Sequence, residues 1–327
     1  MDRIVFHVGP HKTGTTYIQS LLHNNKDTLE FNGVCYPDVY YLHFGHHYLL
    51  NELQGNNSAE EVRKKITGAA LNSSTCILSS ENFIFLRDHG LKKLMLAFEE
   101  FDISFVLYLR RPSLRLLSRW HEEVKHGASE AFESYFFKQI VRPMKSREVN
   151  IFRYVDDLIK IFGRKAVRLV DYDTSAKDKS LMADFQKAAD IGSLVSDVDT
   201  IVNRMTDLAE IEIIRYLNFN AREEKSLKGS NVREKFYELK GERGEFSDLV
   251  RELNLGISAR KKEVVLGDAG FDFAIREKAV GFYKDLFVNK QSIPSGEMVG
   301  YPATEWAFDP RLQSLSKDIS KILLNCL

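Results

Sequence analysis

The sequence predicts an α/β fold, a three-layer sandwich in which helices cover both faces of a central parallel sheet. Short apolar, β-branched runs alternate with longer segments of helical periodicity, and no internal repeat or proline-rich linker interrupts this alternation. Strands that alternate with helices in this way form parallel sheets wrapped on both faces. We expect a single domain over residues 1–327, with a core to about residue 195 and a helical, charge-rich extension over about 196–327.

The elements follow from these patterns. Strands are expected at Arg3–Val8, Thr75–Ser80, Ile103–Leu109 and Ala166–Tyr172. Helices are expected at Thr15–Asn24, Ala59–Leu71, Gly90–Glu100, Pro112–Lys125 and Ile151–Phe162, and in the extension at Asp197–Asn220 and Asn231–Leu253. Ligands of such sheets bind at the carboxyl ends of the strands, so we look for the site there. The charge-rich stretch Arg222–Glu263 reads as a solvated helical face, with a mobile lid as the alternative.

Composition narrows the class of partner. The chain has 46 basic and 46 acidic residues, which gives no general attraction to nucleic acid or membranes. Three cysteines without metal-ligand spacing, Cys35, Cys76 and Cys326, indicate free thiols in a reducing compartment. A strand begins at once, without a basic and apolar leader, and no apolar run reaches the roughly 18–20 residues of a membrane helix. We therefore expect a cytoplasmic protein with no membrane span and no nucleic-acid partner.

The string GPHKTGTT, residues 9–16, connects the first strand to the first helix. A strand that runs through glycines into a helix turns backbone N–H groups toward an anion, and the helix N-terminus adds partial positive charge. The alternative, an ordinary helix-capping turn, does not need so elaborate a string. We predict that this loop binds a phosphate group through Gly9, Pro10, His11, Lys12, Thr13, Gly14, Thr15 and Thr16.

The loop departs from that of magnesium-dependent nucleotide hydrolases. Those loops place lysine directly after the second glycine, where this chain has Thr15, and an acidic residue closes a later strand. Here the third predicted strand is followed by Arg110. The only lysine of the loop is Lys12, and no metal is expected.

A second anion-binding motif follows the third strand. Arg110 offers a planar fork suited to phosphate, and Ser118, eight residues later (118 − 110 = 8), adds a hydroxyl from the next helix. Arg115 and Arg119 lie one helical turn apart and raise the local potential. The alternative is that these arginines line a solvated helix.

Together the strings G-P-x-K-[ST]-G-T-T and R-x-P-x-x-R-x-x-S, in this order, resemble the signatures of sulfotransferases that use 3′-phosphoadenosine 5′-phosphosulfate (PAPS), in their bacterial, P-loop-type form. The resemblance covers residues 1–175; the C-terminal R-K-G segment of that family is absent. It implies that the loop holds the 5′-phosphosulfate and that Arg110 and Ser118 hold the 3′-phosphate. It also implies that PAP is the product and that Lys12 stabilises the negative charge that grows on the leaving 5′-phosphate.

A base should deprotonate the acceptor. The first candidate is Glu81, directly beyond the second predicted strand, although it could instead cap a turn or pair with an arginine. The alternatives are His46 and His47 in YLHFGHHYLL, and His11 in the loop. The string YLHFGHHYLL holds three histidines, His43, His46 and His47, and these lack cysteine or carboxylate partners at ligand spacing, which argues against a metal.

The resemblance implies transfer to a hydroxyl or amine of a small-molecule or carbohydrate acceptor, and the loop string favours a glycan, a lipid-linked saccharide or a small natural product. Two other classes stay open. One is a kinase of a nucleotide or small metabolite on the same scaffold, and the other is a non-catalytic nucleotide-binding module. The placement of Lys12 and the missing acidic strand end count against the kinase, and the presence of Lys12 counts against the non-catalytic module.

Overall fold

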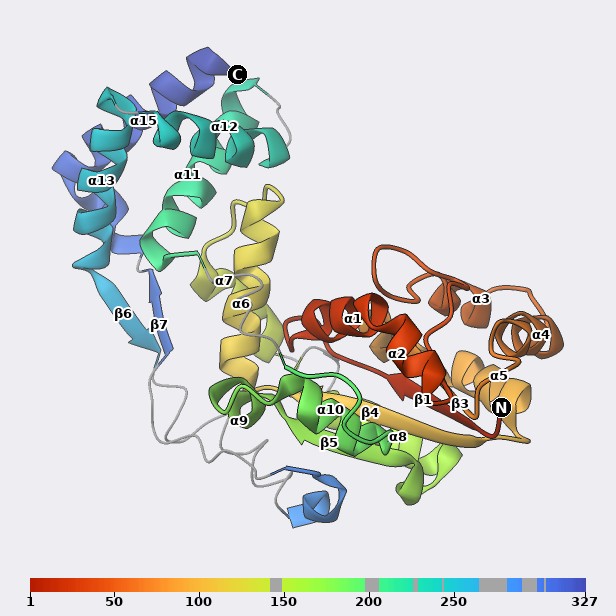
Figure 1. Cartoon of the computed structure of the whole chain (residues 1–327). Coiled ribbons are helices and arrows are strands. Elements are labelled where there is room, and N and C mark those ends of the chain that lie inside the picture. Colours follow the sequence, from red (N-terminus) through yellow and green to blue (C-terminus); the bar gives the residue numbers. More distant parts are fainter. Residues whose placement is uncertain are drawn as a thin grey trace. The chain divides into compact units, whose positions relative to one another are not determined.

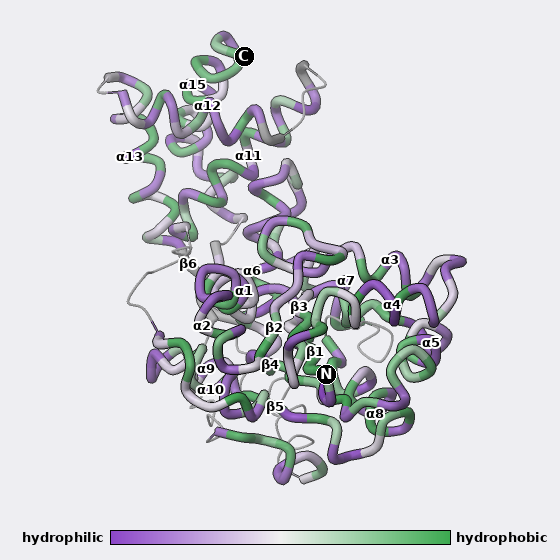
Figure 2. The backbone as a smooth tube through the Cα atoms, turned by 45° about the vertical axis from the view of Figure 1, so that its right-hand side comes forward, coloured by the Kyte–Doolittle hydropathy of each residue, from purple (hydrophilic) through white to green (hydrophobic). Residues whose placement is uncertain are grey.

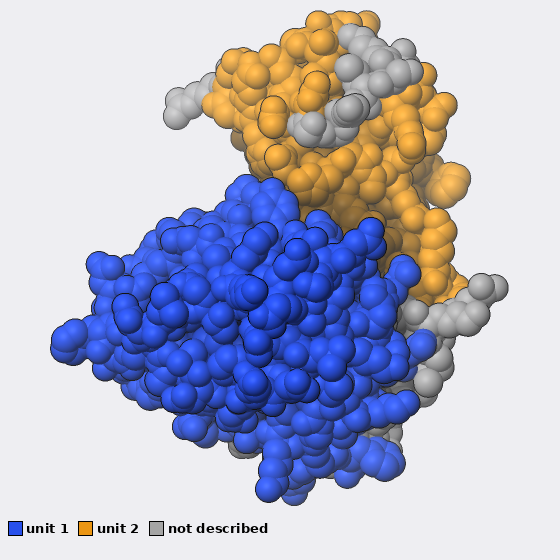
Figure 3. Space-filling model, turned by 90° about the vertical axis from the view of Figure 1, so that its right-hand side faces the viewer, with its two compact units in different colours: residues 1–115, 143–202, 274–294 blue, residues 116–142, 203–273, 295–327 orange. Residues whose placement is uncertain are grey.

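The computed structural model describes residues 1–141, 149–197, 206–225, 229–242, 244–264, 281–289, 299–302 and 304–327. The chain divides into two compact units that interleave along the sequence (Figure 3). Unit 1 comprises residues 1–115, 143–202 and 274–294, and unit 2 comprises residues 116–142, 203–273 and 295–327. The expected single domain over residues 1–327, with a core to about residue 195, stays a prediction.

Unit 1 contains a five-stranded parallel sheet in the order β2-β3-β1-β4-β5, which confirms the α/β fold class (Figure 1). Its strands are β1 (Arg3–His7), β2 (Val34–Cys35), β3 (Thr75–Ser79), β4 (Asp102–Leu109) and β5 (Val167–Asp171). The four predicted strands are present within one residue at each end. The sequence analysis missed β2, because two residues are too few for a periodic pattern.

Helices cover both faces of this sheet. One face carries α1 (Thr15–Asn24), α2 (Lys26–Phe31) and α10 (Leu181–Ala189), which pack on Val5, Ile77 and Val106. The other carries α3 (Leu49–Gln54), α4 (Ala59–Ala69), α5 (Asp88–Phe98) and α8 (Ile151–Phe162), which pack on Ile4, Phe6 and Phe105. Neighbouring strand residues thus face opposite layers, as the period of two requires. Figure 2 shows hydrophobic and hydrophilic segments alternating along these helices.

Short elements complete unit 1. The 3-10 helix η1 (Glu81–Phe85) follows β3, η2 (Arg164–Ala166) precedes β5, and α9 (Tyr172–Lys177) follows it. A late segment with η3 (Lys284–Leu286) lies along the β5 edge, where Val288 N–H donates to the Leu169 carbonyl at 3.0 Å. This segment covers an edge that would otherwise expose unpaired backbone groups.

Unit 2 is mainly helical. Its helices are α7 (Phe132–Ile140), α11 (Leu208–Lys225), α12 (Gly229–Gly241), α13 (Glu245–Ser258) and α15 (Pro310–Cys326), with η4 (Thr304–Phe308). It also holds the antiparallel pair β6 (Lys261–Val264) and β7 (Val299–Pro302). Helix α6 (Pro112–Lys125) begins in unit 1 and continues in unit 2.

Two expectations for the extension need correction. The single helix expected over Asn231–Leu253 is two helices, because Gly241 and Gly244 interrupt it and glycine disfavours the helix interior. The helix expected over Asp197–Asn220 is described from Leu208 onward, as α11, and residues 198–205 lie outside the described residues.

Candidate active site

The loop between β1 and α1 is a tight turn with two residues in the left-handed region. Lys12 has φ 70° and Gly14 has φ 75°. Thr13 is buried and its Oγ1 donates to the Pro10 carbonyl at 2.7 Å. A backbone that mixes left-handed and right-handed residues turns successive N–H groups to one side. The expected anion cradle is therefore compatible with the conformation of this loop.

Two further features leave this loop open to a ligand. Thr15 is 5% exposed, and its buried Oγ1 has no hydrogen-bond partner among the described residues. Gly9 lies so close that a Cβ there would stand 2.3 Å from the same Oγ1. The N-cap of α1, Gly14, provides no side-chain cap for the first N–H groups. The loop therefore keeps backbone and hydroxyl donors at one place.

Arg110 follows β4 and reaches the loop. Its Nη1 donates to the Lys12 carbonyl at 2.8 Å, and its guanidinium carbon lies 5.1 Å from the centre of the Tyr172 ring. Asp173 stands behind it, with Oδ1 4.0 Å from Arg110 Nε and Oδ2 accepting the Arg111 N–H at 2.8 Å. Burial raises the pKa of Asp173. The predicted place of Arg110 at a second anion site stays a prediction; in the structure its guanidinium contacts the loop.

The remaining residues of the second motif lie on α6. Ser118 and Arg119 belong to the part of this helix in unit 2, and Arg119 Nε pairs with Glu123 at 3.5 Å. The helix is the one expected, with the same bounds. The role of Ser118 in holding a phosphate stays a prediction.

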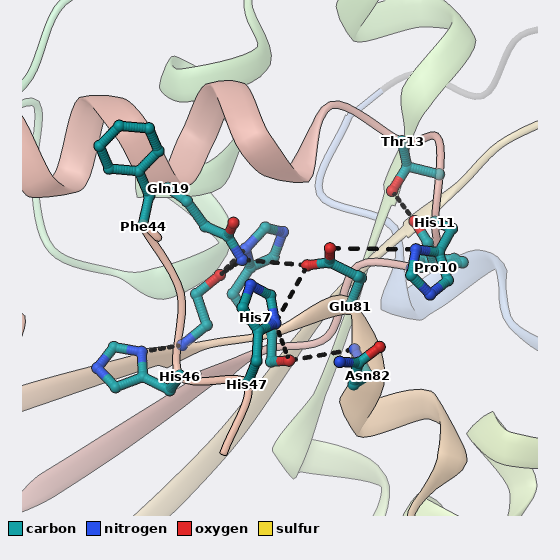
Figure 4. Close-up of polar contacts among 12 residues, drawn as sticks. His7, Pro10, His11, Thr13, Gln19, Phe44, His46, His47, Glu81 and Asn82 are labelled. Atoms are coloured by element: carbon teal, nitrogen blue, oxygen red, sulfur yellow. Dashed lines mark hydrogen bonds and ion pairs between the residues drawn. The ribbon is translucent and has the colours of Figure 1, made fainter. Parts of the chain in front are cut away.

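Glu81 is the first residue of η1, at the carboxyl end of β3, which neighbours β1. Its side chain is 20% exposed, with Oε1 4.0 Å from His11 Nδ1 and Oε2 3.8 Å from His47 Nδ1. Figure 4 shows this carboxylate among residues that come from the loop, α1 and the segment before α3. Three of the four base candidates, Glu81, His11 and His47, are thus neighbours.

His46, the fourth candidate, has a different environment. It is fully buried, the Ser79 N–H donates to its Nδ1 at 3.0 Å, and its Nε2 donates to the Pro37 carbonyl at 2.8 Å. Burial lowers its pKa to about 4, so the ring is neutral at neutral pH. Both ring nitrogens serve the backbone, which leaves neither for an acceptor.

Sequence reasoning missed several polar residues beside Glu81. Gln19 on α1 and Ser79 at the end of β3 are buried, and Gln19 Nε2 donates to Ser79 Oγ at 3.1 Å and to Glu81 Oε2 at 3.3 Å. His7 is buried beside them, its Nδ1 lies 2.8 Å from Ser79 Oγ, and burial lowers its pKa to about 3. The available signal was a glutamine within the apolar face of the first helix.

A cavity of about 500 Å³ opens elsewhere in unit 1. It is lined by residues at the amino ends of the strands, among them Arg3, Asp102 and Arg168. Because the loop and Glu81 stand at the carboxyl ends, this cavity is separate from the candidate site. Among the described residues, no cluster of histidine, cysteine or carboxylate side chains could hold a metal ion.

Comparisons with known proteins give one structural likeness. No protein-family model matches the chain, and no curated protein matches it. A crystal structure of a sulfotransferase from Alicyclobacillus acidocaldarius is similar at a TM-score of 0.43 and 13% identity, over 68% of this chain and 95% of that one. No helix in the described ranges is long and apolar enough to cross a membrane. Because the TM-score and the identity are low, this likeness is not evidence for the role of any residue in the candidate site.

Proposed function

We propose that this protein is a PAPS-dependent sulfotransferase. The observation that supports it is the loop Gly9–Thr16, in which left-handed Lys12 and Gly14 shape the turn and the buried Thr15 hydroxyl has no hydrogen-bond partner in the described part of the chain. A sulfate or phosphate group accepts hydrogen bonds on all sides, so it suits a turn that brings backbone N–H and hydroxyl donors together. In the proposal, Gly9, Pro10, His11, Lys12, Thr13, Gly14, Thr15 and Thr16 hold the 5′-phosphosulfate.

Arg110 and Ser118 are proposed to hold the 3′-phosphate of the donor. The guanidinium of Arg110 already reaches the Lys12 carbonyl at 2.8 Å, which ties it to the loop. A guanidinium has five N–H donors, so one bond to the loop leaves others for phosphate oxygens. Arg110 would then connect the two ends of the donor.

PAPS supplies, as donor substrate, a sulfuryl group on a mixed anhydride. In the proposed transfer the acceptor oxygen bonds to sulfur, the bond from sulfur to the bridging oxygen breaks, and its electron pair leaves with PAP. Lys12 would stabilise the negative charge that grows on the leaving phosphate, which is electrostatic catalysis aimed at the transition state. No metal is required for this step in the proposal.

Glu81 is the proposed base that takes the proton of the acceptor. It lies at the end of β3, beside the loop, and remains partly exposed, so an acceptor can reach it. His11 and His47 flank it, with their Nδ1 atoms within 4.0 Å of its carboxylate oxygens. His46 is left out of the proposed catalytic set, because the backbone uses both of its ring nitrogens.

The proposed acceptor is a hydroxyl or amine of a glycan, a lipid-linked saccharide or a small natural product. The test is transfer of ³⁵S from labelled PAPS to a panel of such acceptors. A parallel reaction offers the same acceptors ATP–Mg that is radiolabelled on its terminal phosphate. The proposal expects labelled product from PAPS and none from ATP–Mg. Lys12→Ala should lower turnover by about 10²–10³-fold with every acceptor, the usual loss for one electrostatic group. Phosphoryl transfer from ATP–Mg would contradict the proposal.

A further inference from the structure

Gln19 is a polar residue on the buried face of α1. It is 3% exposed, and it lies on the helix face that also buries Thr15, Ile18 and Leu22. Burying an amide is unfavourable unless its hydrogen bonds are made, so its partners indicate its role. Helix packing alone would be served by another leucine here.

Both partners of the Gln19 amide nitrogen come from the end of β3. Nε2 donates to Ser79 Oγ at 3.1 Å and to Glu81 Oε2 at 3.3 Å (Figure 4). Ser79 Oγ is itself held by His7 Nδ1 at 2.8 Å. Gln19 therefore bridges a fixed, buried hydroxyl and the partly exposed carboxylate of Glu81.

Gly45 also confines the Gln19 amide. A Cβ at Gly45 would stand 2.6 Å from Gln19 Nε2 and 2.8 Å from His47 Nε2. Two backbone bonds hold Gly45, since its N–H donates to the Leu42 carbonyl at 3.1 Å and its carbonyl accepts the Leu42 N–H at 2.8 Å. The amide thus has little room to turn away from Glu81.

We propose that Gln19 is a positioning residue for Glu81, an assignment that rests on the proposed function. By binding Oε2, the amide fixes the carboxylate so that Oε1 remains on the loop side, 4.0 Å from His11 Nδ1. Oε1 is then the oxygen that receives the acceptor proton. Gln19 touches neither donor nor acceptor in this arrangement and acts only through Glu81.

The experiment compares Gln19→Met, which keeps the length of the side chain but removes its N–H donors, with the wild-type chain. Gly45→Ala is a second, independent variant, because its methyl group would displace the amide. Ser20→Ala is the matched control on α1, since Ser20 Oγ bonds only to the Tyr17 carbonyl among the described contacts. Gly68→Ala is the matched glycine control, because a Cβ there meets nothing within 4 Å.

Gln19→Met and Gly45→Ala should each lower kcat by about tenfold or more, a part of the 10²–10⁴-fold that a general base contributes. Affinity for PAP, measured by calorimetry, should stay within about twofold of wild type in both, because the donor contacts are retained. The loss should be greatest for acceptor hydroxyls of high pKa. In a Glu81→Gln background, Gln19→Met should have no further effect on kcat, because both changes remove the same function. The two control variants should match wild type.

Equal losses from Gln19→Met in the wild-type and Glu81→Gln backgrounds would overturn the positioning role. So would losses of kcat that follow the unfolding temperature across the variants. A separate readout needs no activity: the NMR signals of the Gln19 side-chain amide should shift in Glu81→Gln, and unchanged signals would refute the contact. A wild-type chain that does not bind PAP would refute the proposed function instead, so the two failures are distinguishable.

Discussion

Two buried polar clusters of this protein differ in how completely their hydrogen bonds are made. In unit 2, Glu212 is 1% exposed, and its carboxylate accepts from Arg215 Nε and Nη2, both at 2.7 Å, and from Trp306 Nε1 at 3.0 Å. Arg215 Nη1 also donates to the Ser129 carbonyl at 2.8 Å. Every oxygen of this carboxylate is used within the unit.

In unit 1, the cluster at the ends of β1 and β3 is only partly satisfied. Glu81 is 20% exposed, its histidine neighbours stand 3.8–4.0 Å away, and Thr15 Oγ1 has no partner in the described part of the chain. An unsatisfied buried polar group is unfavourable unless something else binds it. The first cluster therefore maintains the structure, whereas the second contains the groups that are proposed to bind a ligand.

The largest expected effect comes from breaking the satisfied cluster. Glu212→Ala leaves the guanidinium of Arg215 buried without its counter-ion, which typically costs about 3–5 kcal/mol of stability. Urea unfolding should show this loss of stability. The control is Asp248→Asn, which breaks the exposed ion pair of Asp248 with Arg251 and should change the stability by at most about 0.5 kcal/mol. A loss below about 1 kcal/mol in Glu212→Ala would remove the contrast between the two clusters.

Arg110→Ala tests the proposed binding of the donor in unit 1, where the Arg110 guanidinium contacts the loop. Losing one charge-assisted contact should weaken PAP binding by about 1.5–3 kcal/mol, because the guanidinium is proposed to hold a phosphate that does not react. Calorimetry with PAP measures this directly. Unchanged affinity would transfer the 3′-phosphate role to the neighbouring Arg111. Arg119→Ala is the control on α6, where the side chain pairs with Glu123.

His46 belongs to the satisfied class, although it stands beside the site. Burial lowers its folded-state pKa to about 4, whereas an unfolded chain titrates near 6.5. Between these values the unfolded chain binds the extra proton, so stability is lost as the pH falls from about 6.5 to about 4. Buried His7, with a pKa of about 3, acts in the same direction.

Urea unfolding at pH 6.0, 5.5 and 5.0 measures that slope. His46→Gln should reduce it by up to about 1.4 kcal/mol per pH unit, the value of one proton. The exposed residue His89, changed to Gln, should leave the slope unchanged. If the stability of His46→Gln changed with pH as steeply as that of the wild type, His46 would not be a neutral, buried histidine in the folded protein.

Lys12→Gly has the smallest expected effect on stability and the opposite sign. A residue other than glycine at φ 70° is strained, so glycine should stabilise the fold by about 0.5–1 kcal/mol relative to Lys12→Ala. The same variant should lose turnover as Lys12→Ala does. Equal stability of the two variants would show that the left-handed loop conformation is not maintained in solution.

The elements that a local pattern determines could be predicted. The loop, α1 and α6 have the predicted bounds, since glycine spacing and apolar periodicity mark them directly. The strand β2 could not be predicted, because two residues carry no period. The break at Gly241 and Gly244 could have been, since glycines in a helical pattern are a known interruption.

The contacts of the site depend on packing between distant segments, which a single sequence does not show. Glu81 was found because it follows a strand, but the bond from Gln19 to Glu81 spans 62 residues. The bond from Arg110 to the Lys12 carbonyl spans 98 residues and was likewise not foreseen. One of the two backbone bonds that occupy His46 comes from the Ser79 N–H, in a strand 33 residues away, so its sequence neighbourhood did not show that this histidine is occupied.

Calorimetry of PAP against ADP tests whether the loop and Arg110 bind a donor with a 3′-phosphate. ADP carries a 5′-diphosphate but no 3′-phosphate, so it can use the loop alone. PAP should bind more tightly than ADP by about tenfold or more without added magnesium, and Arg110→Ala should remove most of this difference. Equal affinities for PAP and ADP in the wild-type protein would contradict this proposal.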